Sequence, residues 1–350
     1  MTTDQRVEKI CNTLISNNYK ILLIGRELKT SIPISREYEV HRIKLLFNKG
    51  FLFYAEFNIR LFFKLLFLKK HLLISNDLDT LLPNYLISKI QSKKIIYDSH
   101  ELFTEIPELV HRPRVKHIWT KLENYILPKL KNCYTVSQSI ADYYTNKYNT
   151  SFLTIRNLPT VKNRILGVFP FPTNGKKIIL YQGAINIGRG LERMIETMNH
   201  LDNHIFVIIG TGDIIENLKK KNVKLITDKK IYFLGKLLPS EMQKLTPLAD
   251  VGISLEEDLG LNYRYALPNK IFDYLHAEIP VLVSDLPEMK NIIDTYQFGE
   301  TVINRAPEHL ANQIENLLKK DFSSAIKAAK PKLTWQIEKE KLVDLLNNLR

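Results

Sequence analysis

The stretch KKIILYQGAINIGRGLERMIETMNHL (176–201) decides the fold class. It opens with a run of β-branched and aliphatic residues that ends at Gly183, which is typical of a buried parallel strand. From Gly190 onward, apolar residues recur at helical spacing. A strand that leads through a glycine turn into a helix is the repeating unit of α/β proteins with parallel sheets.

Further runs of the same strand type occur along the chain, mostly separated by helical stretches: 19–25, 71–76, 93–99, 132–137, 204–210, 231–235, 250–255 and 279–284. The proline-rich stretch 157–175 has neither period and is predicted to be a linker. We therefore expect an α/β protein of two doubly wound parallel-sheet domains facing a central cleft. The expected parts are an N-terminal domain (1–160), a C-terminal domain (161–333) and a C-terminal helix (334–350) that packs back on the N-terminal domain.

The composition narrows the class of protein. With 45% hydrophobic and 25% charged residues in 350, the chain fits a packed globular protein rather than a disordered one. Its two cysteines, Cys11 and Cys133, exclude a disulfide framework and a four-thiolate zinc site. We see no signal-peptide pattern and no uninterrupted apolar stretch of the roughly 18–20 residues that span a bilayer, and so expect a cytoplasmic protein.

The net charge of +13 is concentrated in the first half: residues 1–165 hold 26 Lys and Arg against 14 Asp and Glu. Such a half attracts nucleic acid, anionic lipid or a phosphorylated substrate. No nucleic-acid recognition module is visible, so we expect no nucleic-acid partner. Residues 49–70 mix aromatic side chains and leucines with cations. We expect most of this segment to be core, with its rim available to an anionic membrane surface as a peripheral contact.

Three motifs in the second half suit phosphate binding. YQGAINIGRG (181–190) places Gly183 and Arg189 between a strand and a helix start, where backbone donors and a guanidinium would meet an anion. GTGD (210–213) follows a strand with Gly210 and Gly212, and LPNKIFDY (267–274) offers Asn269, Lys270 and Asp273 at a helix start. The alternatives are an ordinary βα loop, a tight turn and a capped helix with an i,i+3 ion pair.

Two motifs in the first half carry polar side chains just after strands. YDSHELFTE (97–105) contains His100 and Glu101, and SNDLDTLLP (75–83) contains Asp77 and Asp79. A histidine at such a position can bind sugar hydroxyls or stabilise developing charge. A structural histidine and helix N-capping by the aspartates are the alternative interpretations.

Taken together and in this order, NDLDTLLP, YDSHELFTE, YQGA…GRGLE and LPNKIFDY resemble the family 4 glycosyltransferases, which have the GT-B fold. The resemblance covers residues 20–340 or so. It implies retaining transfer of a sugar from a nucleotide-diphosphate sugar, with no cofactor and no obligatory metal. It also implies a donor bound mainly by the C-terminal domain and a glycan or lipid-linked acceptor on the N-terminal one, in the synthesis of cell-surface polysaccharides or glycans.

The resemblance assigns roles to single residues. Arg189 falls on a diphosphate-binding lysine of the family, His100 on a histidine near the transferred sugar, and Asp273 on a ribose-binding glutamate. We add Lys270 as a second diphosphate cation, because Ala184 replaces a cation of the family. The expected catalytic residues are His100, Arg189 and Lys270. The expected nucleotide-sugar site comprises Gly183, Arg189, Gly210, Gly212, Lys236, Asn269, Lys270 and Asp273, and the expected acceptor side comprises Gly25, Asp77, Asp79 and Glu101.

Two residues depart from the family pattern: Tyr265 stands where the family has a glutamate, and Glu278 where it has a glycine. These departures leave open the alternative of a catalytically weak relative. A nucleotide-sugar epimerase or hydrolase of the same fold is a separate alternative.

Overall fold

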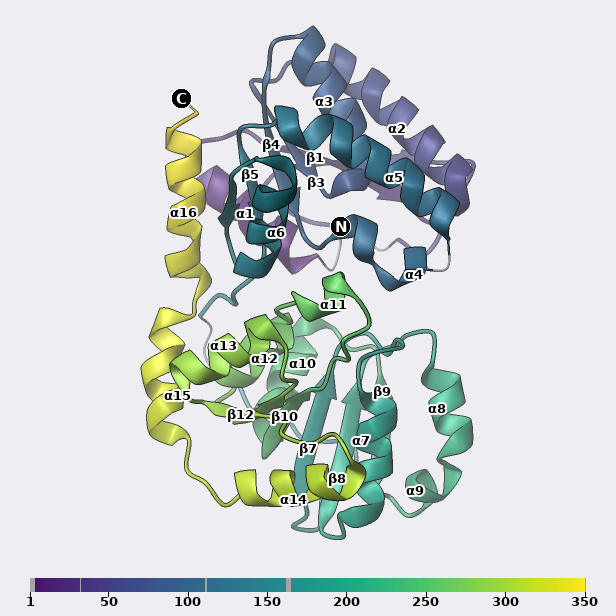
Figure 1. Cartoon of the computed structure of the whole chain (residues 1–350), viewed down its shortest axis with the longest axis vertical. Coiled ribbons are helices and arrows are strands. Elements are labelled where there is room, and N and C mark those ends of the chain that lie inside the picture. Colours follow the sequence, from purple (N-terminus) through teal and green to yellow (C-terminus); the bar gives the residue numbers. More distant parts are fainter. Residues whose placement is uncertain (1–3, 32, 111, 162–164, 350) are drawn as a thin grey trace. The chain divides into compact units, whose positions relative to one another are not determined.

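The structure is a computed structural model that describes residues 4–31, 33–110, 112–161 and 165–349 (Figure 1). The chain divides into two compact units. Unit 1 comprises residues 1–157 and 338–350, and unit 2 comprises residues 158–337. Residues 162–164 of the predicted linker lie outside the described residues. No helix in the described part of the chain has the length and hydropathy needed to cross a bilayer.

Unit 1 is built on parallel strands. Within the described residues they form a two-stranded sheet, β1 (Leu22–Glu27) with β2 (Glu39–Lys44), and a four-stranded sheet. The four-stranded sheet has the order β3 (Leu72–Asn76), β4 (Lys94–Ser99), β5 (Cys133–Thr135) and β6 (Phe152–Thr154). Because all pairs are parallel, the carboxyl ends of β3 and β4 share one edge, and Asn76 pairs with Asp98 there.

The helices of unit 1 are α1 (Gln5–Ser16), α2 (Gly50–Phe67), α3 (Leu81–Ile90), α4 (Pro107–Val110), α5 (Pro113–Ile126) and α6 (Gln138–Tyr148). Short 3₁₀ turns lie at Leu78–Thr80, Phe103–Glu105 and Leu127–Lys129. In α2 the side chains at every fourth position, Phe53, Phe57, Leu61 and Leu65, are buried in the core. This spacing places them on one face of the helix, as an amphipathic pattern requires.

The helix α2 ends at Phe67, within the segment 49–70, because Leu68 is extended. Lys70 then turns back. Its ammonium group donates to the carbonyls of Leu65 and Leu68 and to the side chain of Gln91. Lys70 therefore stabilises the end of the helix.

Unit 2 contains one six-stranded parallel sheet among the described residues, with the order β12-β11-β10-β7-β8-β9. The strands are β7 (Lys177–Gln182), β8 (His204–Ile209), β9 (Ile231–Gly235), β10 (Val251–Ser254), β11 (Val281–Val283) and β12 (Gly299–Thr301). Alternate residues of β8 enter two different cores: Ile205, Val207 and Ile209 on one face, Phe206 and Ile208 on the other. Both faces of the sheet are thus covered, which explains the uninterrupted apolar runs in the sequence.

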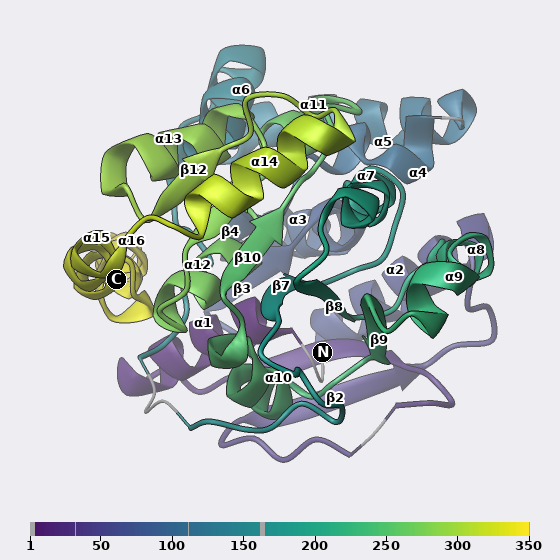
Figure 2. The ribbon, with the colours of Figure 1, turned by 90° about the horizontal axis from the view of Figure 1, so that it is seen from below.

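The helices of unit 2 are α7 (Leu191–Thr197), α8 (Ile215–Lys221), α9 (Val223–Thr227), α10 (Pro239–Leu245), α11 (Leu261–Arg264), α12 (Asn269–His276), α13 (Pro287–Tyr296), α14 (Pro307–Leu317) and α15 (Ser323–Ala329). Short 3₁₀ turns lie at Met198–His200, Thr246–Leu248 and Lys330–Lys332. Helices α7 and α14 lie side by side, as Figures 1 and 2 both show. The chain runs from β7 outward to β9 and returns to β10 beside β7, so the strand order reverses between β7 and β10. Open α/β sheets bind ligands at this reversal.

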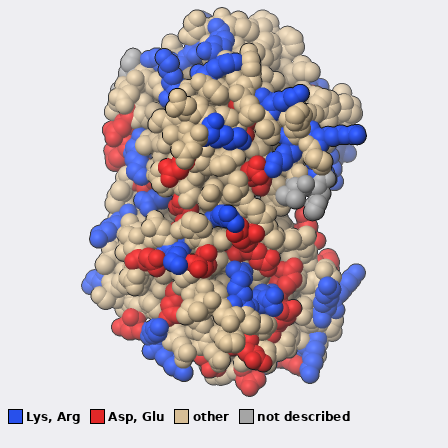
Figure 3. Space-filling view, in the orientation of Figure 1, with Lys and Arg blue, Asp and Glu red and all other residues tan. Residues whose placement is uncertain are grey.

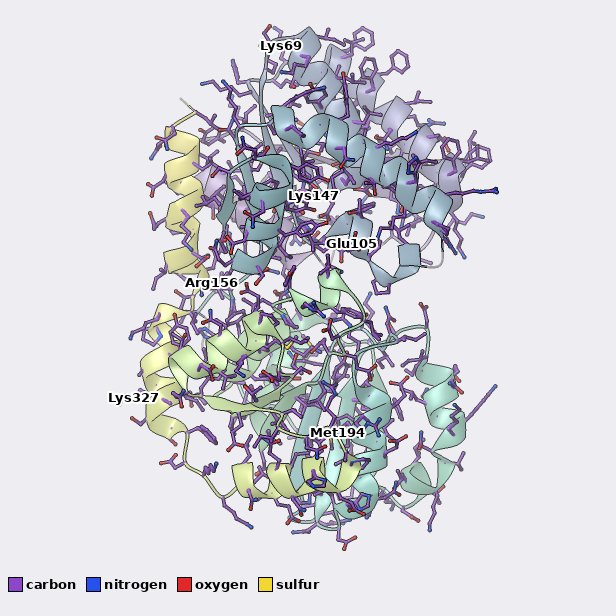
Figure 4. All side chains as sticks on the ribbon, in the orientation of Figure 1. Lys69, Glu105, Lys147, Arg156, Met194 and Lys327 are labelled. Atoms are coloured by element: carbon purple, nitrogen blue, oxygen red, sulfur yellow. The ribbon has the colours of Figure 1, made fainter. Side chains whose placement is uncertain are left out.

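The last helix, α16 (Trp335–Asn347), begins in unit 2 and continues in unit 1. Its Glu338 is buried and accepts hydrogen bonds from the backbone and guanidinium of Arg156, which Figure 4 labels. Lys341 adds a bond to the Thr154 carbonyl at 3.1 Å. These contacts attach residues 338–347 to the end of the four-stranded sheet within unit 1.

Candidate functional site

Three neighbouring strands of unit 2 end in a glycine with positive φ. Gly183 follows β7 (φ 139°), Gly210 follows β8 (φ 149°), and Gly235 ends β9 (φ 70°). A Cβ on Gly210 would lie 1.8 Å from the carbonyl oxygen of Gly183, so only glycine fits where these two loops touch. The edge of the sheet therefore presents peptide groups rather than side chains, and a ligand can approach the backbone closely.

Gly212 has a similar role one step further along the second loop. A Cβ there would lie 2.2 Å from the Ile185 carbonyl oxygen. The amide of Asp213 donates to the side chain of Asn186 at 3.2 Å. The loops after β7 and β8 are thus packed against each other through three glycines that were predicted to belong to the nucleotide-sugar site, Gly183, Gly210 and Gly212.

Arg189 and Lys270 meet at one buried carboxylate, that of Glu256. Lys270 Nζ donates to Glu256 Oε1 at 2.7 Å, and Arg189 Nη1 lies 3.4 Å from the same oxygen. Ser254 Oγ donates to Glu256 Oε2 at 2.7 Å. These residues come from the loop after β7, the end of β10 with the loop after it, and the first turn of α12. Because β7 and β10 are neighbouring strands at the point where the strand order reverses, the sheet brings together the loops that carry Arg189 and Glu256.

The charges of this cluster are unequal. Two cations share one carboxylate, so the cluster carries a net positive charge. Lys270 is 8% exposed and Glu256 is fully buried, while Arg189 is 26% exposed. The Nε of Arg189 is itself buried and has no hydrogen-bond partner among the described residues. A buried donor without a partner is uncommon in proteins.

Aromatic rings flank both cations. The Nζ of Lys270 lies 4.1 Å from the centre of the Tyr181 ring, and the Arg189 guanidinium lies 5.0 Å from that of Tyr263. Burial lowers the pKa of Lys270. Burial alone would raise the pKa of Glu256, but the charges of Lys270 and Arg189 outweigh it and hold that pKa below its usual value. Glu256 is therefore ionised across the neutral pH range.

Asp273 lies on α12 one turn after Lys270, and its carboxylate accepts a hydrogen bond from Gln182 Nε2 at 3.0 Å. Gln182 is in turn held by Thr246, whose hydroxyl donates to its Oε1 at 2.9 Å. Asn269 begins the same helix and is exposed, as is Lys236 in the loop after β9. Pro268 precedes this helix as its N-cap residue.

Arg305, which sequence analysis did not select, fixes the backbone beside Glu256. Its guanidinium donates to the carbonyls of Leu255 at 2.6 Å and Glu256 at 3.2 Å. The hydroxyl of Ser284 also donates to the Glu256 carbonyl, at 2.6 Å. A run of three acidic residues (256–258) after a buried strand was the available signal, but it does not show which of them turns inward. Arg305 has no local signal, because the backbone carbonyls that it binds lie about 50 residues away in the chain.

Unit 1 has a separate cluster around His100. The ring Nε2 of His100 lies 3.0 Å from Asp98 Oδ2, and Nδ1 lies 3.4 Å from Asp77 Oδ2. Arg6 of α1 binds the fully buried Asp98 with Nε and Nη2, the latter at 2.7 Å. Burial alone would raise the pKa of Asp98, but the charges of Arg6 and His100 lower it to about 2. Burial alone would lower the pKa of His100, but Asp77 and Asp98 raise it to about 9, so the ring is charged at neutral pH.

Asp77 joins the ends of β3 and β4. Its φ of 57° lies in the region that side chains rarely adopt. Its amide donates to the Asp98 carbonyl, and its carboxylate accepts the amide of His100, both at 2.8 Å. Burial, and then the charge of Asp77, raise the pKa of nearby Asp79 to about 7. Backbone strain and shifted carboxylate pKa values occur together at functional sites more often than elsewhere.

The other residues expected on the acceptor side lie in different settings. Gly25 lies within strand β1 and is buried. Glu101 follows β4 and is half-buried, and its carbonyl accepts the hydroxyl of Ser99 at 2.8 Å. No group of three or more His, Cys, Asp or Glu side chains in the described residues is arranged to hold a metal ion.

The chain is similar in structure to several solved proteins. Sucrose-phosphate synthase from Thermosynechococcus elongatus aligns with a TM-score of 0.74 at 15% identity, over 98% of this chain and 92% of that one. Anabaena Alr3699/HepE, in complex with UDP and glucose, aligns with a TM-score of 0.75 at 12% identity, over 99% of this chain and 97% of that one. WaaG, a glycosyltransferase involved in lipopolysaccharide biosynthesis, aligns with a TM-score of 0.66 at 12% identity, over 98% of this chain and 95% of that one.

The fold is GT-B. In sequence, residues 176–320 match the family model described as Glycosyl transferases group 1, which covers most of unit 2. An uncharacterized glycosyltransferase of Methanocaldococcus jannaschii, MJ1607, is 27% identical over 148 residues. The match covers 41% of this chain and 36% of that protein, so the chain aligns with about a third of its curated relative.

Proposed function

We propose that this protein is a glycosyltransferase that transfers a sugar from a nucleotide-diphosphate sugar to a glycan or lipid-linked acceptor. The observation that carries the proposal is the pairing of Arg189 and Lys270 beside the glycine edge of unit 2. It lies where the strand order reverses, within the segment that matches the group 1 family model. A structural relative has been solved with UDP-glucose, which supports a nucleotide-sugar donor.

The chemistry follows from charge. Breaking the bond between the sugar and the diphosphate leaves negative charge on the departing oxygen. Arg189 and Lys270, which are held in place before the reaction, would stabilise that charge in a site with little water. Removing one such group typically slows a reaction about 10²–10³-fold. Since the two cations supply this stabilisation, we also propose that no metal is obligatory, and activity should survive an excess of EDTA.

We further propose that Asp273 binds the ribose hydroxyls and that Lys236 and Asn269, both exposed, contact the nucleotide. In unit 1, the carboxylates of Asp77 and Asp79 would accept hydrogen bonds from hydroxyl groups of the acceptor. His100, charged and held by Asp77 and Asp98, would fix the orientation of this carboxylate cluster.

Calorimetry with UDP, GDP and ADP, and with their glucose conjugates, tests the proposal. We expect one nucleoside diphosphate to bind the wild-type protein, and Arg189→Ala or Lys270→Ala to weaken binding about tenfold or more. Arg193→Ala is the matched control, because Arg193 lies on α7 and pairs with exposed Glu196. The proposal fails if the wild-type protein binds none of the diphosphates or if the control weakens binding equally.

Turnover separates the reaction classes. We propose that transfer retains the anomeric configuration, which NMR of a freshly formed product would establish. If the donor is consumed at the same rate without any acceptor, the protein is a hydrolase or an epimerase of the same fold. If the donor binds but no acceptor from a glycan and lipid panel is modified, the protein is a catalytically weak relative.

A peripheral membrane contact through unit 1 is part of the proposal. Opposite its buried face, α2 exposes large apolar side chains: Phe51, Leu52, Ile59, Phe63 and Phe67. We call these five side chains the α2 outer face. Lysines lie beside it, including exposed Lys69 just past the helix (Figure 4). In Figure 3 the upper part of unit 1 shows Lys and Arg (blue) over α2 and α5, with few acids (red). Apolar side chains beside lysines fit an anionic lipid surface, which accepts both.

Flotation with vesicles tests this contact. The protein should bind vesicles rich in phosphatidylglycerol and bind phosphatidylcholine vesicles weakly. Phe67→Ser should reduce binding about tenfold or more, since a fully transferred Phe side chain contributes roughly 1.5–3 kcal/mol. Ile303→Ser, at an exposed site of unit 2, is the control. Lys69→Glu should weaken binding, whereas Lys70→Met should not, because Lys70 is bound internally. Equal binding to both vesicle types excludes an electrostatic contact.

A further inference from the structure

The carboxylate of Glu256 is more firmly held than a surface residue would be. Both of its oxygens are hydrogen-bonded, Oε1 to Lys270 and Oε2 to Ser254. Its backbone carbonyl accepts from Ser284 and from Arg305. The side chain therefore has a fixed position next to both cations of the site, and it is fully buried.

A buried ammonium group needs a negative partner to stay charged. Lys270 is 8% exposed, and burial by itself favours the neutral amine. The groups that face its Nζ are the Glu256 carboxylate at 2.7 Å, the Arg189 guanidinium bound to the same carboxylate, and the Tyr181 ring at 4.1 Å. Arg189 opposes the positive charge of Lys270, and Arg305 approaches the backbone of Glu256. The ionised carboxylate of Glu256 is therefore the group that keeps Lys270 charged.

We infer that Glu256 is a positioning residue of the diphosphate site: it keeps Lys270 protonated and holds Lys270 and Arg189 at one point, ready for the donor. This inference rests on the proposed function. One carboxylate against two cations leaves a positive charge for the diphosphate, whereas a second carboxylate would cancel it. Glu256 also competes with the donor for the same cations, so its removal has opposite effects at low and high pH.

The test is the pH dependence of binding of the nucleoside diphosphate that the wild-type protein prefers. For each pH between about 6.5 and 9.5, the Kd of Glu256→Gln is divided by that of the wild type, which cancels the titration of the phosphate itself. At the lowest pH the ratio should be near or below one, because Lys270 is still charged in the variant and no longer pairs with the Glu256 carboxylate. Above the pKa of Lys270 in the variant, the ratio should rise about tenfold per pH unit, since binding then requires a proton.

Adding Lys270→Arg to Glu256→Gln supplies the control. A guanidinium stays charged without a carboxylate, so the ratio for the double variant should not change with pH. If Glu256→Gln does not fold, Glu256→Asp makes the same comparison, with the rise beginning at a higher pH, because its carboxylate lies one methylene further from Lys270 but still favours the charged ammonium. Thermal unfolding of each variant shows which can be used.

The outcomes separate the inference from the proposed function. If the wild-type protein binds no nucleoside diphosphate, the proposed function fails. If the wild type binds and the ratio is the same at every pH, Glu256 has only a structural role and the inference is wrong. If the ratio rises with pH and Lys270→Arg does not remove the rise, another group titrates and the inference is also wrong.

Discussion

Replacing His100 by glutamine is expected to remove a pH dependence from the stability of unit 1. In the wild type the imidazolium ring is bound on both nitrogens by carboxylates, Asp98 at 3.0 Å and Asp77 at 3.4 Å. These interactions favour the charged ring and raise its pKa, against the effect of burial, to about 9. Glutamine can donate to one of the carboxylates but cannot take up a proton.

The expected change in stability follows from the size of the pKa change. Raising the pKa of His100 from 6.5 to about 9 corresponds to roughly 3 kcal/mol of folding free energy. Because the pKa of the folded state is the higher one, this contribution is fully present below the unfolded value of 6.5. It is lost as the pH rises through about 9. Between about pH 6 and 10, the unfolding free energy of the wild type should therefore fall by roughly 3 kcal/mol relative to that of His100→Gln.

The chain offers a selective probe for this measurement. It has two tryptophans, Trp119 in unit 1 and Trp335, which precedes the part of α16 that belongs to unit 1. In a Trp335→Phe background, the fluorescence of Trp119 follows unit 1 alone during unfolding in urea. NMR of the histidine ring protons gives the pKa of His100 directly, with its signal assigned as the one missing from His100→Gln.

Asp77→Asn provides the matched control, since it removes one carboxylate and should lower the pKa of His100. The reasoning is refuted if the His100 signal titrates at or below pH 7. It is also refuted if the unfolding free energies of the wild type and His100→Gln change in parallel with pH.

Other variants test the remaining contacts. Arg6→Met should destabilise unit 1 by about 3–5 kcal/mol, because it leaves buried Asp98 without its principal cation, and Asp98→Asn in the same chain should restore most of the loss in urea unfolding. The low pKa of Asp98 predicts a contribution to stability that is present above about pH 4 and lost as the pH falls through about 2, and acid titration of Asp98→Asn should lack it. Gly190 and Gly235 have similar positive φ angles, 72° and 70°, but different surroundings. A Cβ on Gly190 would lie 2.1 Å from the Leu255 carbonyl oxygen, whereas a Cβ on Gly235 would meet nothing within 4 Å, so Gly190→Ala and Gly235→Ala should differ in thermal unfolding. We expect Gly235→Ala to lower the free energy of unfolding by about 1–2 kcal/mol, and Gly190→Ala to lower it by about 1–3 kcal/mol more. Nucleotide binding should be lost only in Gly190→Ala.

The sequence predicted the fold best where strands are buried on both faces. The runs 176–183 and 204–210 became β7 and β8, whose alternate residues fill two cores. Strands that were not predicted are short or partly exposed: β2 has no apolar run, and β6 and β12 each contain three residues. Their pairing depends on neighbours distant in the chain, and no local pattern records it.

For the site, the sequence selected both cations but not the carboxylate between them. Arg189 and Lys270 stood out because each lies at a helix start after a strand or a turn. Glu256 is followed by Glu257 and Asp258, and nothing in the order of these residues shows which one turns inward. Arg6 binds a residue 92 positions away, a contact that only the folded chain creates. The binding of a diphosphate at this site stays a prediction.

The glycine-lined edge of unit 2 has a consequence for changing donor preference. Backbone peptide groups do not distinguish one nucleotide from another. Gly183 and Gly210 cannot be replaced by another residue without moving the backbone. Selectivity for one base or sugar must then come from neighbouring exposed positions such as Ala184, Thr211 and Lys236, where side chains can vary freely. Libraries built at those positions would search for new donors while leaving the anion-binding framework intact.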